Sequence, residues 1–312
     1  MTLFEQLAGL TTEQGNPRTA EIDLVDTRSL VDLLHREDQM VAGAVATQAD
    51  PIAAAIDIIA AAFRRGGRLI YVGAGTSGRL GIVDASECPP TYGTHPAMVQ
   101  GIIAGGTGAV FASVEGAEDD ADAGAESLHG LPTVDGEPRD VGGNDVVCGI
   151  TASGRTPFVI GALAEAERLG SATVLVSTNP FDVVSAIAPF VTIHICPVVG
   201  PEPIAGSTRM KSGTAQKMVL NMLTTGAMVR IGKTFGNVMV DLQRTNAKLQ
   251  ERAKHIVMRI TGVTHDEAAS LLEASEGSVK VAIVMGLNQC SPETARALLA
   301  DAGGTIRAIK RS

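Results

Sequence analysis

The sequence predicts an α/β fold, in which a parallel sheet has helices on both of its faces. Between residue 66 and about residue 200, strand-like runs alternate with helical ones. Most of the strand-like runs are apolar throughout, which is typical of strands that helices cover on both sides. Thirty-five glycines and only 3% aromatic residues fit layers joined by many tight turns. We therefore expect a three-layer αβα sandwich, preceded by a helical arm and followed by a small helical module.

Helical periodicity begins before the sheet. Apolar residues recur at helical spacing in residues 26–36 and again in 42–65, where Ile52 and Ile59 share one face. Residues 1–65 are therefore expected to form an N-terminal helical arm. Such an arm packs on its own domain or on a second subunit.

The strands of the predicted sheet are apolar runs at residues 69–72, 98–103, 145–150, 172–177 and 191–196. Residues 126–144 are rich in Gly, Pro and Asp, and they are expected to form a loop. Two long helices, over 212–230 and 236–254, carry Met, Leu and Val on one face. Together these elements form the expected main domain, residues 66–255.

The chain changes character after about residue 256. Thr264 and Glu267 have the spacing of a capping box, and Ser291 with Pro292 starts a further helix. We expect a small three-helix module over residues 256–312, for which packing or protein interaction is the expected role.

Composition and charge restrict the class of function. The formal net charge of −9 argues against a nucleic-acid partner, which needs a basic face, but it leaves an anionic substrate open. The four cysteines are widely spaced and form no C-x-x-C pair, so we expect neither a metal site nor a disulfide framework. The sequence shows no export signal and no apolar run long enough to span a membrane. We expect a cytoplasmic protein with no membrane partner.

The first expected strand runs into a turn of glycines and hydroxyls, residues 73–78 (GAGTSG). Glycines let the backbone approach a ligand closely, and N–H groups at the start of the following helix suit an anionic oxygen. Together with the hydroxyls of Thr76 and Ser77, this turn predicts a phosphate site. The alternative is an ordinary strand-to-helix loop.

The same residues also fit the dinucleotide fingerprint G-x-G-x-x-G. That site needs an acidic residue about 20 residues further on, which binds a ribose hydroxyl. No acidic residue occurs between Cys88 and Val114, where the second strand is expected. No Gly-Lys-Ser/Thr follows the turn either, so both nucleotide-binding interpretations lose their support.

A second loop repeats the design of the first. Residues 149–157 (GITASGRTP) contain the end of an apolar strand, a Ser-Gly turn, and a helix that starts at Pro157. Loops that follow the carboxyl ends of parallel strands lie at the same edge of a sheet, where ligands of such sheets bind. The two loops are therefore expected to share one anionic ligand.

Longer motifs around these loops resemble a known family. They are the run from Gly73 to Gly93 (GAGTSGRLGIVDASECPPTYG), VEGAED at 114–119, ASGRTP at 152–157, and GSTRMKSGTAQKMVLNML at 206–223. The domain resembles the sugar isomerase (SIS) domain, a flavodoxin-like αβα sandwich that binds phosphosugars. The full set of motifs resembles the N-acetylmuramic acid 6-phosphate etherases, from the helical arm through the C-terminal module.

The resemblance implies a lyase that removes D-lactate from N-acetylmuramic acid 6-phosphate and leaves N-acetylglucosamine 6-phosphate, in the recycling of peptidoglycan sugars. It implies a homodimer that needs no metal and no cofactor. The ether is inert to direct hydrolysis, so elimination followed by water addition is the expected route. That route needs one carboxylate as base and one carboxylic acid as proton donor.

The resemblance assigns these two roles to Glu118 as base and Glu87 as proton donor. The residues alone leave the assignment open, because Glu118 is one of four carboxylates in residues 114–120 and such a run is usually a solvated face. Glu87 lies among small and apolar residues, so we expect partial burial and a raised pKa. The alternative for Glu87 is a surface residue at a helix end.

Substrate-binding residues are expected in both loops and in the segment before the helix at 212–230. They are Thr76, Ser77, Gly78, Arg79, Ser153, Gly154, Arg155, Thr156, Glu202 and Ser207. Arg79, Arg155, Arg209 and Lys211 are possible partners for the phosphate or the lactyl carboxylate. Glu202 resembles the position of the base in sugar isomerases of this superfamily, and its alternative is a plain loop residue.

Two other functions stay open from the residues. An aldose–ketose phosphosugar isomerase would use Glu202 as its base and release no lactate. A non-catalytic phosphosugar sensor would need a basic DNA-binding segment or a second sugar-binding domain. Residues 1–65 hold more acids than bases, and the chain has no room for a second such domain.

Overall fold

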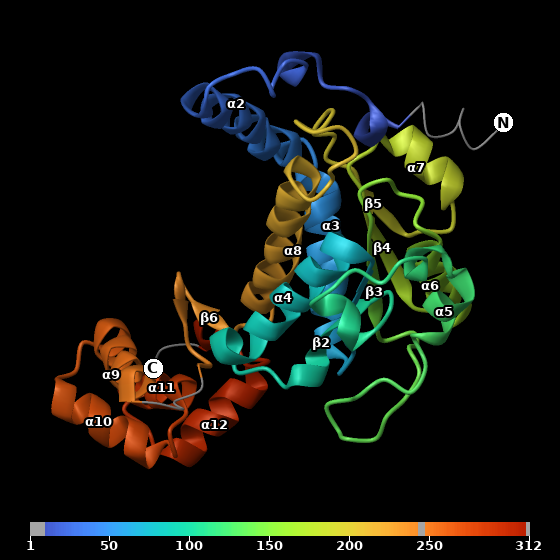
Figure 1. Ribbon diagram of the computed structural model, residues 1–312. Coiled ribbons are helices and arrows are strands. Elements are labelled where there is room, and N and C mark those ends of the chain that lie inside the picture. Colours follow the sequence, from blue (N-terminus) through green and yellow to red (C-terminus); the bar gives the residue numbers. More distant parts are fainter. Residues whose placement is uncertain (1–9, 243–246, 310–312) are drawn as a thin grey trace. The chain divides into compact units, whose positions relative to one another are not determined.

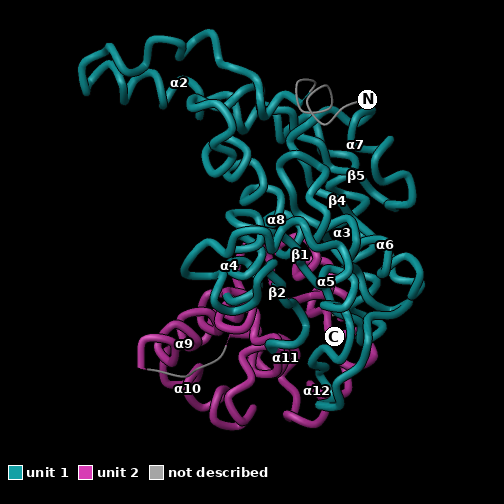
Figure 2. The backbone as a smooth tube through the Cα atoms, turned by 45° about the vertical axis from the view of Figure 1, so that its right-hand side comes forward, with its two compact units in different colours: residues 1–86, 96–224 teal, residues 87–95, 225–312 magenta. Residues whose placement is uncertain are grey.

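The computed structural model describes residues 10–242 and 247–309 (Figure 1). The chain divides into two compact units, coloured separately in Figure 2. The first contains residues 1–86 and 96–224, and the second contains residues 87–95 and 225–312. The expected helical arm belongs to the same unit as the sheet. The expected division at residues 65 and 255 stays a prediction.

The first unit contains a five-stranded parallel sheet of strand order β2-β1-β3-β4-β5. Its strands are β1 (Leu69–Gly73), β2 (Val99–Ile103), β3 (Val146–Ile150), β4 (Ala172–Val176) and β5 (Ile193–Ile195). They coincide with the predicted runs. Gly73 at the end of β1 pairs with Ile150 at the end of β3, so the two strands end level with each other. The two hydroxyl-rich loops therefore start side by side, where the strand order reverses.

Helices cover both faces of this sheet, which confirms the predicted αβα sandwich. Figure 1 shows α3 (Ala49–Arg64), α4 (Gly75–Tyr92) and α8 (Lys211–Arg230) on one side. On the other side lie α5 (Ala121–Glu126), α6 (Pro157–Arg168) and α7 (Phe181–Ile187). The core under α6 is apolar and includes Val72, Val147, Leu163 and Leu175, all completely buried. Short 3-10 turns connect these elements, among them η1 (Thr11–Glu13), η4 (Thr107–Val110) and η5 (Ala117–Asp119).

The arm differs from its prediction in one respect. The predicted segments 26–36 and 42–65 are two helices, but the break between them lies later than expected: α2 (Thr27–Ala46) continues past residue 42, and α3 begins at Ala49. The Thr47 hydroxyl donates to the Ala44 carbonyl at 2.7 Å, and the Gln48 side chain accepts the Cys196 N–H at 2.9 Å. In the part of the chain that the structure describes, no single helix has the length and hydropathy of a membrane span, although α2 and α3 taken together across their 63° bend do.

The amino edge of the sheet is closed by a buried ion pair. Arg68, just before β1, donates Nη2 to Asp145 Oδ2 at 2.9 Å, and both side chains are at most 1% exposed. Arg68 also donates to the carbonyls of Leu131 and Asp140 at 3.1 and 2.9 Å, and Arg139 donates Nη1 to Asp145 at 2.7 Å. These bonds fasten the predicted loop over 126–144 to the sheet.

The second unit is mainly helical. A hairpin of β6 (Thr234–Phe235) and β7 (Val238–Met239) precedes α9 (Ala247–Thr261), α10 (His265–Ala274), α11 (Val279–Asn288) and α12 (Pro292–Asp301). The predicted helix over 236–254 is therefore wrong at its start, because Gly236 has a φ of 59° and turns the hairpin. The capping box of Thr264 and Glu267 is present at α10. The core of the second unit is apolar and is centred on α11.

Candidate active site

The turn after β1 is built from glycine backbones that pack against each other. α4 begins at Gly75, which has a φ of 52°, and the Gly78 N–H donates to the Ala74 carbonyl at 3.2 Å. A Cβ on Gly73 would lie 2.6 Å from the Gly78 nitrogen, so a side chain there would force the turn open. The tight turn brings the N-terminal end of α4, a feature that attracts anions, to the carboxyl end of β1.

The loop after β3 presents hydroxyls. Thr151 Oγ1 lies 2.8 Å from Thr156 Oγ1 and 3.3 Å from Ser153 Oγ. Ser153 Oγ also accepts the Arg155 N–H at 3.2 Å. Gly154 has a φ of 76°, a conformation that strains any other residue. The turn at Gly154 holds three hydroxyls together at the start of α6.

A cavity of about 260 Å³, which we call the hydroxyl cavity, joins the two loops. Its lining residues are Thr12, Glu13, Ala74, Gly75, Thr76, Ser77, Glu118, Ile150, Thr151, Ala152, Ser153, Thr156, Gly206 and Thr208. Thr76 and Ser77 therefore meet Ser153, Thr156 and Glu118 in one place. The other predicted residues are outside this lining; they are Gly78, Arg79, Glu87, Gly154, Arg155, Glu202 and Ser207.

The N-terminal arm contributes two residues to the lining, and neither was predicted from the sequence. Thr12 and Glu13 lie in η1, where the Thr11 N–H donates to Asn179 Oδ1 at 2.8 Å. The Thr12 carbonyl accepts the Gly206 N–H at 3.2 Å. Asn179 is 168 residues away in the sequence from Thr11, so no local pattern indicates this contact.

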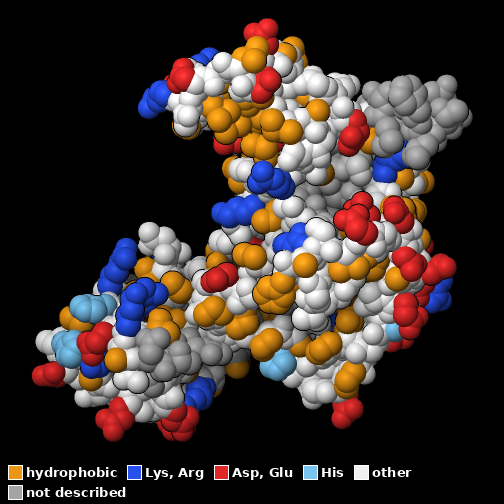
Figure 3. Space-filling model, viewed as in Figure 1, with side chains coloured by type: hydrophobic (Ala, Val, Ile, Leu, Met, Phe, Trp, Pro, Cys, Tyr) orange, Lys and Arg blue, Asp and Glu red, His pale blue; other side chains and the backbone are white. Residues whose placement is uncertain are grey.

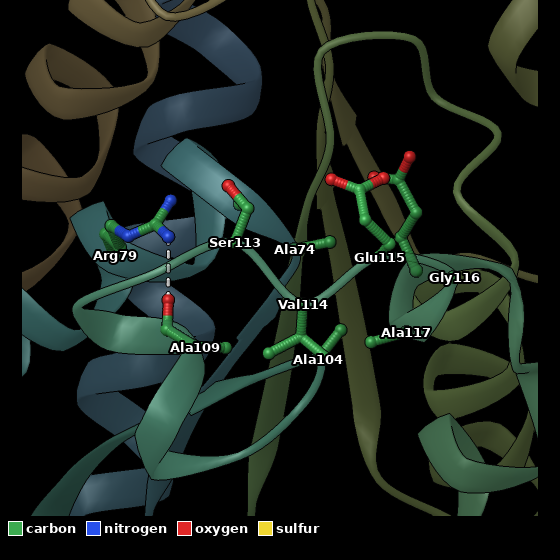
Figure 4. A pocket seen from close by; sticks show the side chains of 11 residues that line it. Ala74, Arg79, Ala104, Ala109, Ser113, Val114, Glu115, Gly116 and Ala117 are labelled. Atoms are coloured by element: carbon green, nitrogen blue, oxygen red, sulfur yellow. Dashed lines mark hydrogen bonds between the residues drawn. The ribbon is translucent and has the colours of Figure 1, made fainter.

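Glu118 also borders a second cavity, of about 150 Å³. Figure 4 shows Glu115 on one side of this cavity and Arg79, which donates to the Ala109 carbonyl at 2.7 Å, on the other. Glu118 is exposed, and within the described part of the chain its carboxylate makes no hydrogen bond or ion pair. Among the residues described, no group of three or more His, Cys, Asp or Glu side chains is arranged to hold a metal ion. Glu118 thus offers an unengaged carboxylate to both cavities.

Glu87 lies on α4, about three turns after Gly75. Its expected partial burial is wrong for the single chain, because the side chain is exposed. The buried face of α4 contains Asp84, Ala85 and Cys88, and Glu87 falls on the other face. The Glu87 carboxyl lines neither of the two cavities.

Glu202 has a structural position. Its side chain is fully buried, and its two carboxylate oxygens accept the N–H groups of Lys211 and Ser212, each at 2.9 Å. It therefore caps the N-terminus of α8, where a negative charge is favourable. Glu202 does not line the hydroxyl cavity, and its expected contact with the sugar stays a prediction.

The basic residues divide into engaged and exposed ones. Lys211 is fully buried and donates Nζ to Glu37 at 2.7 Å. Hydrogen bonds from Arg18, Lys211 and Asn16 outweigh the burial of Glu37 and lower the pKa of this carboxyl to about 2. Arg209 is exposed. Lys211 is therefore not available to an anion, whereas Arg209 is.

One carboxyl with a raised pKa lies close to the turn but serves packing. Burial raises the pKa of Asp84, against the effect of hydrogen bonds from Asn221, at 2.6 Å, and from the Tyr71 hydroxyl, at 2.9 Å. These bonds link α4 to β1 and α8. Asp84 fixes the helix that carries the turn, and it lines neither cavity.

Known proteins have sequences similar to that of this chain over almost its whole length. A family model described as the glucokinase regulatory protein N-terminal SIS domain matches residues 51–167. The N-acetylmuramic acid 6-phosphate etherase of Rhodopirellula baltica is 50% identical over 304 residues, which cover 97% of each chain. The etherase of Salinibacter ruber is 52% identical over 307 residues, which cover 98% of this chain and 95% of the relative. With identity at this level over almost its whole length, the chain belongs to the N-acetylmuramic acid 6-phosphate etherase family.

Proposed function

We propose that this protein cleaves the lactyl ether of N-acetylmuramic acid 6-phosphate and releases D-lactate and N-acetylglucosamine 6-phosphate. The observation that carries the proposal is the hydroxyl cavity, which is lined by two loops suited to phosphate and by Glu118, whose carboxylate makes no bond to any residue that the structure describes. The substrate is taken from the name of relatives that are 50% and 52% identical to this chain. The fold alone does not identify a substrate, because SIS-type folds host several chemistries.

The phosphate group fits between the two helix N-termini. α4 and α6 both begin at the carboxyl edge of the sheet, and their positive ends favour a dianion. The hydroxyls of Thr76, Ser77, Ser153 and Thr156 lie in the same lining and can donate to phosphate oxygens. This arrangement binds an anion without a buried lysine or arginine, which suits a chain with a net charge of −9.

Glu118 is the proposed base. In the ring-opened sugar the C1 aldehyde acidifies the C2 proton, and the Glu118 carboxylate removes it. The electron pair of the C2–H bond forms the C2–C3 double bond, and the C3–O bond breaks with its electron pair on the lactate oxygen. Water then adds its hydroxyl to C3, and C2 regains a proton. A free carboxylate at the cavity wall is the group that this step needs.

Glu87 is the proposed proton donor for the lactate oxygen. Its position on α4 and its motif support the role by resemblance to the family. If Glu87 protonates the leaving group, Glu87→Gln should slow lactate release strongly. With a substrate analogue that carries a halide at C3, which leaves without a proton, the same substitution should lower the rate far less. Equal losses for the two leaving groups would remove Glu87 from this role.

We also propose that the protein works as a homodimer. Figure 3 shows hydrophobic side chains gathered over the region of α2, and the exposed large apolar residues in the segment from residue 24 to residue 40 are Leu24, Val25, Val31 and Met40. Apolar surface of this kind marks an interface. Light scattering should give twice the mass of the 32.1 kDa chain, and Val31→Asp with Met40→Asp should halve it. A monomeric wild-type protein would refute this part of the proposal.

The proposed place of the reaction is the cytoplasm, in the recycling of peptidoglycan sugars, because the charge of a phosphorylated sugar keeps it from crossing a membrane.

The decisive test of the proposed function is an assay for D-lactate with N-acetylmuramic acid 6-phosphate and folded protein. We expect stoichiometric D-lactate and N-acetylglucosamine 6-phosphate. Interconversion of a phosphosugar without lactate would indicate the isomerase instead.

A further inference from the structure

A buried glutamine lies behind the first loop of the hydroxyl cavity. Gln216, on α8, is 1% exposed, and its Oε1 accepts the Ser77 hydroxyl at 2.9 Å. Its Nε2 has no hydrogen-bond partner among the described residues. A buried amide N–H without a partner costs free energy, so a purely structural role would be served better by an apolar side chain.

The orientation of this amide decides what Ser77 can offer to a ligand. A serine hydroxyl has one proton and two lone pairs. In the orientation described above, the Ser77 proton points to Gln216 Oε1, and only lone pairs remain for the cavity. Lone pairs repel the oxygens of a phosphate. As it stands, Ser77 therefore lines the phosphate site with the wrong polarity.

A half-turn of the amide reverses that polarity. Oε1 and Nε2 have nearly the same shape, so the rotation exchanges them without displacing α8. Gln216 Nε2 would then donate to Ser77 Oγ, and the Ser77 proton would be free to donate to a phosphate oxygen. The same rotation moves Oε1 to the position where Nε2 has no partner among the described residues, so the amide keeps one hydrogen bond in either orientation. The anion that accepts the Ser77 proton is therefore what selects the rotated orientation.

We infer that Gln216 is a positioning residue that turns the Ser77 hydroxyl into a donor when the phosphate group binds. The inference rests on the proposed phosphosugar site and adds to it the residue that sets its polarity. Gln216 touches neither the sugar nor the reacting atoms. Its effect reaches the ligand through Ser77 alone.

A double-mutant cycle on the full-length protein tests this coupling. The variants are Gln216→Met, which keeps the size and loses the amide, Ser77→Ala, and the two combined. The measurement is calorimetric binding of N-acetylglucosamine 6-phosphate, with N-acetylglucosamine and inorganic phosphate as further probes. We expect Gln216→Met to weaken binding of the phosphosugar about fivefold to tenfold, the size of a weakened hydrogen bond to a charge. In the Ser77→Ala background the same change should have no further effect.

The same substitution of Gln216 in a Ser153→Ala variant distinguishes positioning of Ser77 from a general effect on packing. Ser153 lies in the other loop and makes no bond to Gln216, so Gln216→Met should retain its full effect when combined with Ser153→Ala. The variant should raise KM and leave kcat nearly unchanged, because the phosphate is remote from the bond that breaks. If Gln216→Met unfolds the chain, Gln216→Leu takes its place in the cycle.

The outcomes separate the inference from the proposed function. Equal losses in the wild-type and Ser77→Ala backgrounds would overturn the inference, as would unchanged phosphosugar binding by Gln216→Met. A wild-type protein that releases no lactate and binds no phosphosugar would instead refute the proposed function on which the inference rests.

Discussion

The two edges of the sheet are chemically opposite. At the amino edge, the charges of Arg68 and Asp145 are buried and engaged with each other and with loop carbonyls. At the carboxyl edge, the hydroxyls of Ser153 and Thr76 and the carboxylate of Glu118 line an open cavity. The same strands therefore carry satisfied polar groups at one end and accessible ones at the other.

The difference indicates which polar groups serve stability and which serve function. A buried, fully bonded charge cannot change partners without a large loss of free energy, so it fixes a loop. An exposed carboxylate without a partner contributes little to folding and is free to act on a ligand. Substitutions at the two edges should therefore have separable effects, on unfolding at one edge and on turnover at the other.

The largest expected effect is that of Glu118→Gln on turnover. Loss of a general base lowers kcat by about 10²- to 10⁴-fold. Because Glu118 is exposed and has no partner among the described residues, the midpoint of urea unfolding should stay within error of the wild type. The comparison of edges fails if this variant loses stability or keeps more than a tenth of its lactate release.

Asp145→Ala should produce the opposite pattern. It leaves Arg68 buried without its counter-charge, which costs about 3–5 kcal/mol in the free energy of unfolding. The matched control is Asp122→Ala at an exposed position of α5, expected within about 0.5 kcal/mol of the wild type. Below the unfolding transition, KM should be close to the wild-type value. A change in KM without loss of stability would contradict the division between edges.

The pH dependence of stability should expose the buried carboxylates. The pKa of Glu37 falls from 4.5 to about 2 on folding, chiefly because Arg18 donates to it. The contribution of Glu37 to the free energy of unfolding is therefore complete above pH 4.5 and is lost as the pH falls towards 2. The expected loss is about 3 kcal/mol, and Glu37→Gln should flatten the curve of unfolding free energy in this range.

Asp145 should add to that slope. Burial alone would raise its pKa, but hydrogen bonds from Arg68 and Arg139 outweigh the burial and lower it. Its contribution likewise disappears as the pH falls.

The smallest of these effects is expected for Ser153→Ala. Loss of one hydroxyl that donates to phosphate weakens binding by roughly tenfold, as for a hydrogen bond to a charged group. KM for N-acetylmuramic acid 6-phosphate should rise with little change in kcat. Thr214→Ala on α8, an exposed hydroxyl bonded to the Met210 carbonyl, is the control. Equal effects from the two variants would mean that the second loop does not bind the phosphate.

Most of the fold could be predicted because the strands of a covered parallel sheet are apolar throughout. The five runs and the two loops were read directly from the chain, and their level ends confirm that the loops meet. The hairpin at Gly236 escaped prediction because the flanking strands are only two residues long and have no period. Such short segments take their structure from a single glycine conformation.

The site could be predicted where its residues lie in the two loops or in a motif that resembles the family, as Glu118 does. Thr76, Ser77, Ser153, Thr156 and Glu118 meet as expected. The engagement of Glu202 and the position of Glu13 escaped prediction for a physical reason. Both depend on tertiary contacts: a loop that folds back on the start of α8 and η1 held by a distant asparagine.

The most direct test of the central claim is the reaction of N-acetylmuramic acid 6-phosphate in D₂O with wild-type protein and Glu118→Gln. If Glu118 removes the C2 proton at the carboxyl edge, the wild type releases D-lactate, and its N-acetylglucosamine 6-phosphate carries one deuterium at C2. Glu118→Gln, folded and equally stable, should form neither product at a comparable rate. Lactate released without deuterium at C2, or undiminished turnover by Glu118→Gln, would contradict the account.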